Sequence, residues 1–212
     1  MTPDAASLST ELPPPRPAVT GVIGGLVLMA VFTALWSSLS ISAWPGPRAW
    51  SITAVGALTA VVFLGGAVRL ARSLQHFPSM ESAPDHARGR RVGIAFGCVF
   101  ATEGLLIGVT SAVLQARGLG DYEIPAVALI VGLHFAPMAR IFDRTIDYYV
   151  SAWLSAVAIV GIIAVGRSWA AVPHVWGCVG IGAALSTMTY GVFMLHVTND
   201  LLHRLPTQAR PL

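Results

Sequence analysis

Residues 130–140 read Ile-Val-Gly-Leu-His-Phe-Ala-Pro-Met-Ala-Arg. The stretch is apolar enough to lie in lipid, but it carries His134 at its middle and Pro137 one turn later. It belongs to a longer apolar run, residues 124–142, which approaches the ~20 residues that a transmembrane helix requires. A polar side chain at that depth needs a partner, because unsatisfied polar groups are costly in hydrocarbon. The rest of the chain therefore has to supply further spans and a partner for His134.

The composition of the whole chain indicates a membrane protein. Apolar residues make up 55% of the 212 residues and charged residues 11%, and the mean hydropathy is +0.70. Soluble domains usually carry about 25% charged residues. A chain so poor in charge cannot cover a globular surface with polar groups, so the lipid bilayer is its expected partner.

Six apolar runs have lengths near that of a membrane-spanning helix. They predict an all-α integral membrane bundle of six transmembrane helices, formed by residues 19–43, 50–70, 92–116, 124–142, 148–165 and 172–197. The bundle occupies residues 19–203 as one domain. A Pro-rich, disordered cytoplasmic tail is expected at residues 1–18, and a short cytoplasmic tail at 204–212.

The distribution of arginine predicts the orientation of the bundle, because cytoplasmic loops carry an excess of basic residues. All 13 basic residues are arginines. Ten fall on the side of the two termini and three on the other side, at Arg48, Arg117 and Arg167. Both termini are therefore predicted to be cytoplasmic. Basic residues interleaved with aromatic ones do not form a patch, so nucleic acid is not an expected partner.

Small residues at helical spacing predict which helices pack closely, because helices in lipid associate where backbones can approach each other. Two runs carry such stripes: Gly93, Gly97, Ala101, Gly104 and Gly108 in the third, and Gly177, Gly180, Ala184, Thr187 and Gly191 in the sixth. We expect both helices to be central and tightly packed. Cys98 and Cys178 lie in these two runs and are expected to be buried and unbridged.

Glu103 is the carboxylate predicted to lie at mid-membrane, in the third run. It is 11 residues into that run, about 17 Å from its inner end, and His134 is 10 residues into the fourth run, about 15 Å from its outer end. Since the two helices are antiparallel and the hydrocarbon core is ~30 Å thick, both side chains should lie near the midplane. The sequence therefore predicts that Glu103 and His134 belong to one polar centre.

Membrane energetics explain why these two residues should associate. A lone charge at mid-bilayer costs at least about 2.5–3.5 kcal/mol, and sharing a proton would lower that cost. Pro137 lacks an N–H and so frees the Leu133 carbonyl beside His134. Residues of the sixth run near the same depth could complete a substrate or proton pathway; they are Ser186, Thr187 and Tyr190.

Two further sets of polar residues lie near helix ends. Asp143 and Asp147 alternate with Arg140 and Arg144, which predicts a local ion-pair set at the inner interface, and such pairs usually contribute little. The second set lies at the end of the sixth run and consists of His196, Asp200 and His203. These residues share a helix face, as metal ligands would, but we interpret them as a solvated helix terminus.

Residues 131–150, VGLHFAPMARIFDRTIDYYV, resemble a signature of a family of small, uncharacterised bacterial multipass membrane proteins. In that signature a G-x-H-F-x-P run closes one span and a Tyr-Tyr pair opens the next. The matching positions are Gly132, His134, Phe135, Pro137, Tyr148 and Tyr149. The resemblance implies a bacterial protein with six spans and singles out His134. No function is carried over from it.

Three functions remain open. The first is a multipass protein of the bacterial inner membrane in which Glu103 and His134 serve proton-linked transport or permeation of a small solute. The second is a non-catalytic scaffold or accessory subunit, in which the pair holds helices together. The third is an intramembrane enzyme or metal- or haem-binding protein, although no catalytic motif, metal-ligand set or cofactor motif is found, which favours a non-enzyme over an enzyme.

Overall fold

The computed structural model describes residues 14–79 and 83–205. In these ranges the chain is helical and forms no strand. The long helices are α1 (Arg16–Ser38), α3 (Pro47–Ser73), α4 (Ala83–Ala116), α5 (Glu123–Phe142), α6 (Thr145–Gly166) and α7 (Val172–His203). Three short helices join them: α2 (Ser40–Ala43), η2 (Leu74–His76) and η3 (Gly120–Tyr122). The expected tail residues 1–13 and 206–212 lie outside the described ranges.

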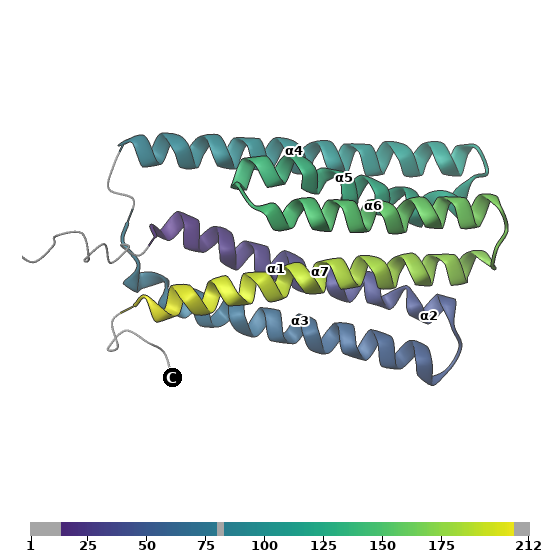
Figure 1. Ribbon diagram of the computed structural model, residues 1–212, viewed down its shortest axis with the longest axis horizontal. Helices are drawn as coiled ribbons and strands as arrows, with labels where there is room; N and C mark the ends of the chain where they lie inside the picture. The colour runs from purple at the N-terminus through teal and green to yellow at the C-terminus, as the bar shows by residue number, and fades with distance from the viewer. Residues whose placement is uncertain (1–13, 80–82, 206–212) are drawn as a thin grey trace, which may run out of the picture.

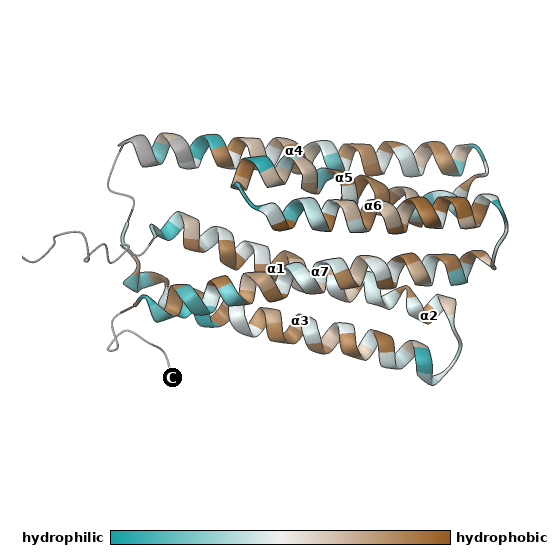
Figure 2. Cartoon of the chain, viewed as in Figure 1, coloured by the Kyte–Doolittle hydropathy of each residue, from teal (hydrophilic) through white to brown (hydrophobic). Residues whose placement is uncertain are grey.

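The described ranges contain six segments that are long and apolar enough to cross a membrane. Their apolar residues occupy the length of the bundle, whereas hydrophilic residues gather toward its two ends (Figure 2). The predicted all-α, six-helix membrane fold is therefore confirmed, and the protein is a multipass membrane protein by its helices.

The first span is interrupted near its end. α1 ends at Ser38 and α2 resumes at Ser40, with the Leu39 N–H bonded to the Trp36 carbonyl. Nearby serine hydroxyls donate to backbone carbonyls three residues earlier, as Ser37 does to Ala34 and Ser40 to Ser37. Serine side chains that compete for backbone acceptors favour such bends.

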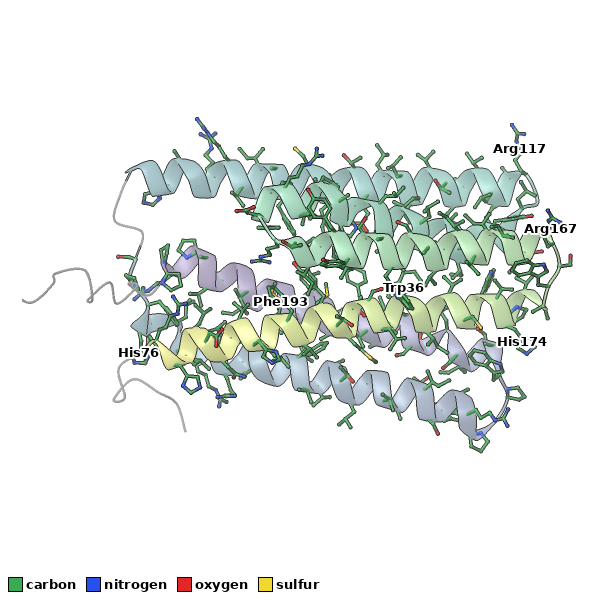
Figure 3. The ribbon with its side chains drawn as sticks, in the orientation of Figure 1. Trp36, His76, Arg117, Arg167, His174 and Phe193 are labelled. Atoms are coloured by element: carbon green, nitrogen blue, oxygen red, sulfur yellow. The ribbon has the colours of Figure 1, made fainter. Side chains whose placement is uncertain are left out.

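Across the bundle lie α4, then α5 and α6, then α1 and α7, which cross in this view, and then α3 (Figure 1). Helix α1 packs on both α3 and α7, α3 also packs on α7, and α6 joins α7 to α5. The ends at which α1 begins and α7 finishes lie together, and we call this the terminal end (Figure 1). His76 lies there, whereas Arg117, Arg167 and His174 lie at the opposite end (Figure 3).

The prediction that α7 is central is confirmed. In its apolar stretch 56% of the residues are buried. Its glycines face neighbouring helices at close range: a side chain at Gly180 would meet the Trp36 carbonyl and Leu39, and one at Gly191 would meet the ring of Phe63. These glycines are required because α1, α2 and α3 approach the α7 backbone.

The prediction that the third span is central is wrong. Helix α4 lies at the edge of the bundle, packs mainly on α5, and has 6% of its apolar stretch buried. A side chain added at Gly93, Gly97, Gly104 or Gly108 would meet nothing within 4 Å. The stripe points away from the bundle because Glu103 and its helical neighbours occupy the face toward α5. Cys98 and Cys178 are unbridged, as expected, but both are exposed rather than buried.

Candidate functional site

Glu103 on α4 and His134 on α5 are brought together. The Nδ1 atom of His134 lies 3.2 Å from Oε1 of Glu103, and the two side chains are 11% and 7% exposed. His134 Nδ1 makes no hydrogen bond of good geometry. The two side chains are therefore within the distance of an ion pair but do not form an aligned hydrogen bond. Glu103 lies 13 residues before the end of α4, and His134 lies 11 residues after the start of α5, about 20 and 17 Å along the helices. Both are therefore well inside the bilayer-spanning region.

Helical periodicity explains how the pair forms. Phe96, Phe100 and Glu103 recur at spacings of four and three, so they share the α4 face that packs on α5. Pro137 sits inside α5, one turn after His134, and removes the N–H that would bond the Leu133 carbonyl. Helix α5 nevertheless continues to Phe142.

Aromatic rings enclose the imidazole of His134. The centroid of the Phe135 ring lies 4.3 Å from the centroid of the imidazole. The centroid of the Phe100 ring lies 6.1 Å from it, and the two rings meet edge-on. Phe135 continues the row to Tyr190 on α7 at 5.8 Å. This apolar lining lowers the local dielectric, which strengthens the attraction between Glu103 and a protonated His134 and raises the cost of separating them.

A second buried carboxylate lies in the first turn of α6. Asp147 is 1% exposed, and neither of its oxygens has a hydrogen-bond partner of good geometry. The Tyr190 hydroxyl is its neighbouring hydrogen-bonding group, and Arg144 and His134 interact with Asp147 electrostatically. The spacing of Asp147 from Arg144 predicts an ion-pair set at the interface. The structure instead turns it inward, on the same face as buried Val150 and Leu154.

Arg144, which interacts with this carboxylate, is positioned by a tight turn between α5 and α6. Asp143 adopts a left-handed conformation with φ 53° and closes α5, and the Arg144 N–H bonds the Ala139 carbonyl. Arg144 then donates from Nη1 to the Tyr190 hydroxyl at 3.2 Å and lies over the ring of Phe142. The α5–α6 turn stops short of the terminal ends of α4 and α7 (Figure 1). Asp147 is thus set inward from that end of the bundle.

The residues predicted on α7 serve different contacts. The Thr187 hydroxyl lies 2.8 Å from that of Thr33 on α1, and Ser186 donates to the Gly182 carbonyl of its own helix. Tyr190 bonds Arg144 and lies against Phe135. Of the three, Tyr190 therefore reaches the Glu103–His134 region through the Phe135 ring, Thr187 lies in the α1–α7 contact, and Ser186 is buried and bonded to its own helix.

Metal ligation has no support in the described residues. They contain no group of three or more His, Cys, Asp or Glu side chains placed to hold a metal ion. His196 directs Nδ1 at its own helix, 2.8 Å from the Val192 carbonyl.

Together, the cluster consists of Glu103, His134, Asp147, Arg144 and Tyr190, contributed by four consecutive segments of the chain. It places an imidazole 3.2 Å from one buried carboxylate and in electrostatic interaction with a second. Such a set can hold a proton, pass it between groups, or pair charges so that helices stay in register. We call it the buried polar cluster.

Comparisons of this chain with protein-family models, curated proteins and solved structures find no match. The class that the fold and the cluster define is a six-span multipass membrane protein with two carboxylates and a histidine buried among its helices.

Proposed function

We propose that this protein moves protons through the buried polar cluster and couples that movement to transport or permeation of a small solute. The observation that carries the proposal is Asp147, a carboxylate that is 1% exposed and lies beside Arg144 and His134, and whose interaction with the Tyr190 hydroxyl is not an aligned hydrogen bond. Such a group is costly to keep, because a buried charge needs to be both paired and well hydrogen-bonded. Ionisable residues inside transmembrane bundles commonly serve proton relays.

The proposed route uses groups at two depths. Glu103 and His134 form its deeper part, and Asp147, with Tyr190 and Arg144, the part nearer the terminal end. The excess of arginine at the terminal end supports a cytoplasmic location for both termini. In a bacterial inner membrane the route would then lead from mid-membrane toward the cytoplasm.

Proton flux into proteoliposomes tests this function. The purified protein would be reconstituted with a pH-sensitive dye inside, and a potassium diffusion potential would be imposed. We expect faster acidification than in empty liposomes, and loss of that excess in Glu103→Gln and Asp147→Asn. The matched control is Asp121→Asn, which changes an exposed carboxylate at the opposite end. Wild-type flux equal to that of empty liposomes would reject the proposal.

A scaffold function is the second candidate, and the position of α4 favours it. This helix packs mainly on α5, and Glu103 is its charged contact with that neighbour. In a scaffold the pair would fix α4 against α5 without moving protons. Glu103→Leu would then reduce thermal stability, while neither the wild type nor any variant would conduct protons.

A further inference from the structure

A groove between α3 and α7 lies away from the buried polar cluster. It has a volume of about 650 Å³ and opens on the outer surface of the bundle, because most of its lining residues are exposed. Its apolar part is formed by Val62, Gly65 and Val68 of α3 and Leu195 of α7. Its polar part is formed by Arg69, Arg72 and Asn199. One part of the groove is therefore apolar, and the other part is cationic.

The two arginines form a cationic site on one helix face. Arg69 and Arg72 are three residues apart, so they lie on the same side of α3. Both are exposed, and neither forms a salt bridge with a carboxylate of the described residues. Two guanidinium groups with an amide beside them match the hydrogen-bonding needs of a phosphate.

The depth of the groove matches that of a lipid molecule. Exposed Trp50 near the start of α3 marks one membrane interface, as aromatic residues commonly do. Arg69 follows 19 residues later, about 29 Å along the helix, which equals the ~30 Å thickness of the hydrocarbon core. The arginines therefore lie at headgroup level of the other leaflet, while Val62 and Gly65 lie at the level of the acyl chains.

Glycine keeps the apolar part open. A side chain at Gly65 would meet nothing within 4 Å, so the groove is empty there. At the adjacent Gly66 a side chain would collide with Leu195. Close packing of α3 on α7 at Gly66 forms the floor, and the missing side chain at Gly65 leaves room above it.

From these features we propose that the α3–α7 groove binds one anionic glycerophospholipid. An acyl chain lies along Gly65 and Leu195, and the phosphate is held by Arg69 and Arg72. Basic pockets between transmembrane helices are known to suit anionic headgroups. The site is independent of the buried polar cluster, and its occupancy does not depend on proton movement.

Native mass spectrometry of the full-length protein in mild detergent tests the proposal. Phosphatidylglycerol and phosphatidylcholine with identical acyl chains would be titrated separately. We expect one phosphatidylglycerol to bind preferentially, with affinity reduced about fivefold by Arg69→Gln or Arg72→Gln and about thirtyfold by both. The matched control is Arg48→Gln with Arg117→Gln, which removes two exposed charges from the opposite end.

Gly65→Leu separates a lipid from a soluble phosphate. It fills the acyl-chain part and should weaken phosphatidylglycerol binding at least tenfold. Gly24→Leu, at another open glycine, should leave binding unchanged. Inorganic phosphate should not displace the lipid at millimolar concentration. Equal binding of both lipids, an unchanged affinity in Gly65→Leu, or displacement by inorganic phosphate would each overturn the proposal.

Folding of the variants is checked by melting curves in lipid-free detergent. Arg69, Arg72 and Gly65 are exposed, so these curves should match that of the wild type. Arg69→Lys with Arg72→Lys retains the charge and should keep most of the preference for phosphatidylglycerol. A loss of preference in this variant equal to that in the glutamine variant would contradict a charge-based site.

Discussion

Replacement of Glu103 by leucine should destabilise the contact between α4 and α5. The carboxylate lies 3.2 Å from His134 Nδ1, and both side chains are nearly buried. Its loss leaves a buried imidazole without a partner, which costs about 1–3 kcal/mol. At about 2–4 °C per kcal/mol for a protein of this size, the melting temperature should fall by about 2–12 °C.

An exposed pair between the same two helices provides the control. Gln115 on α4 donates to Glu123 on α5 at 2.6 Å, but this pair is exposed. Gln115→Leu should change the free energy of unfolding by no more than about 0.5 kcal/mol, as expected for a surface position. Burial, rather than the presence of a polar contact, then explains the difference between the two variants.

A double-mutant cycle extends this test. It adds melting curves in detergent for His134→Leu and for the double variant Glu103→Leu/His134→Leu. Removing both members leaves no unpaired polar group among the surrounding phenylalanines, so the double variant should be more stable than Glu103→Leu alone. Two results would refute this reasoning. One is an equally small change of melting temperature in Glu103→Leu and Gln115→Leu. The other is a change in the double variant that equals the sum of the changes in Glu103→Leu and His134→Leu.

Two further predictions concern packing. Gly191→Ala should lower the free energy of unfolding by about 1–3 kcal/mol, because the added methyl group meets the buried ring of Phe63, whereas Gly104→Ala should be neutral or raise stability by up to about 1 kcal/mol. A melting temperature that falls in Gly104→Ala and not in Gly191→Ala would contradict the arrangement of α4 and α7. Thr33→Val should cost about 0.6–1.7 kcal/mol by breaking the 2.8 Å contact with Thr187, and adding Thr187→Val should cost little more. Urea or thermal unfolding of both variants checks this, and a second loss as large as the first would contradict it.

Much of the fold could be predicted from the sequence because the spans depend on local composition. Each run is apolar over about the thickness of the bilayer, and lipid leaves the backbone few alternatives to a helix. The predicted ends differ mainly where helices extend beyond the hydrocarbon. Helix α4 begins at Ala83 rather than at residue 92, and α7 continues to His203 rather than ending at 197.

The position of a helix in the bundle depends on contacts that local composition does not encode. The stripes in α4 and α7 have nearly the same spacing, yet the glycines of α7 meet Phe63 and Trp36 while those of α4 meet nothing. A stripe of small residues permits close approach but does not supply a neighbour. The face of α4 that packs on a neighbouring helix, α5, is the face that carries Glu103.

The candidate site was predictable in part. Similar depth on antiparallel neighbours predicted that Glu103 and His134 belong together, and the structure places them 3.2 Å apart. The burial of Asp147 was missed, because its spacing from Arg144 is typical of a surface ion pair. A signal was present in its helical register with Val150 and Leu154, which are buried on the same face.

Infrared difference spectroscopy of the reconstituted protein, recorded as the pH is changed, tests the proton-handling role of the buried polar cluster most directly. The proposed role predicts carboxyl bands that change with pH, one lost in Glu103→Gln and another lost in Asp147→Asn. It also predicts that Glu103→Gln shifts the Asp147 band, because His134 interacts with both carboxylates. Spectra in which neither variant removes a pH-dependent carboxyl band would contradict it.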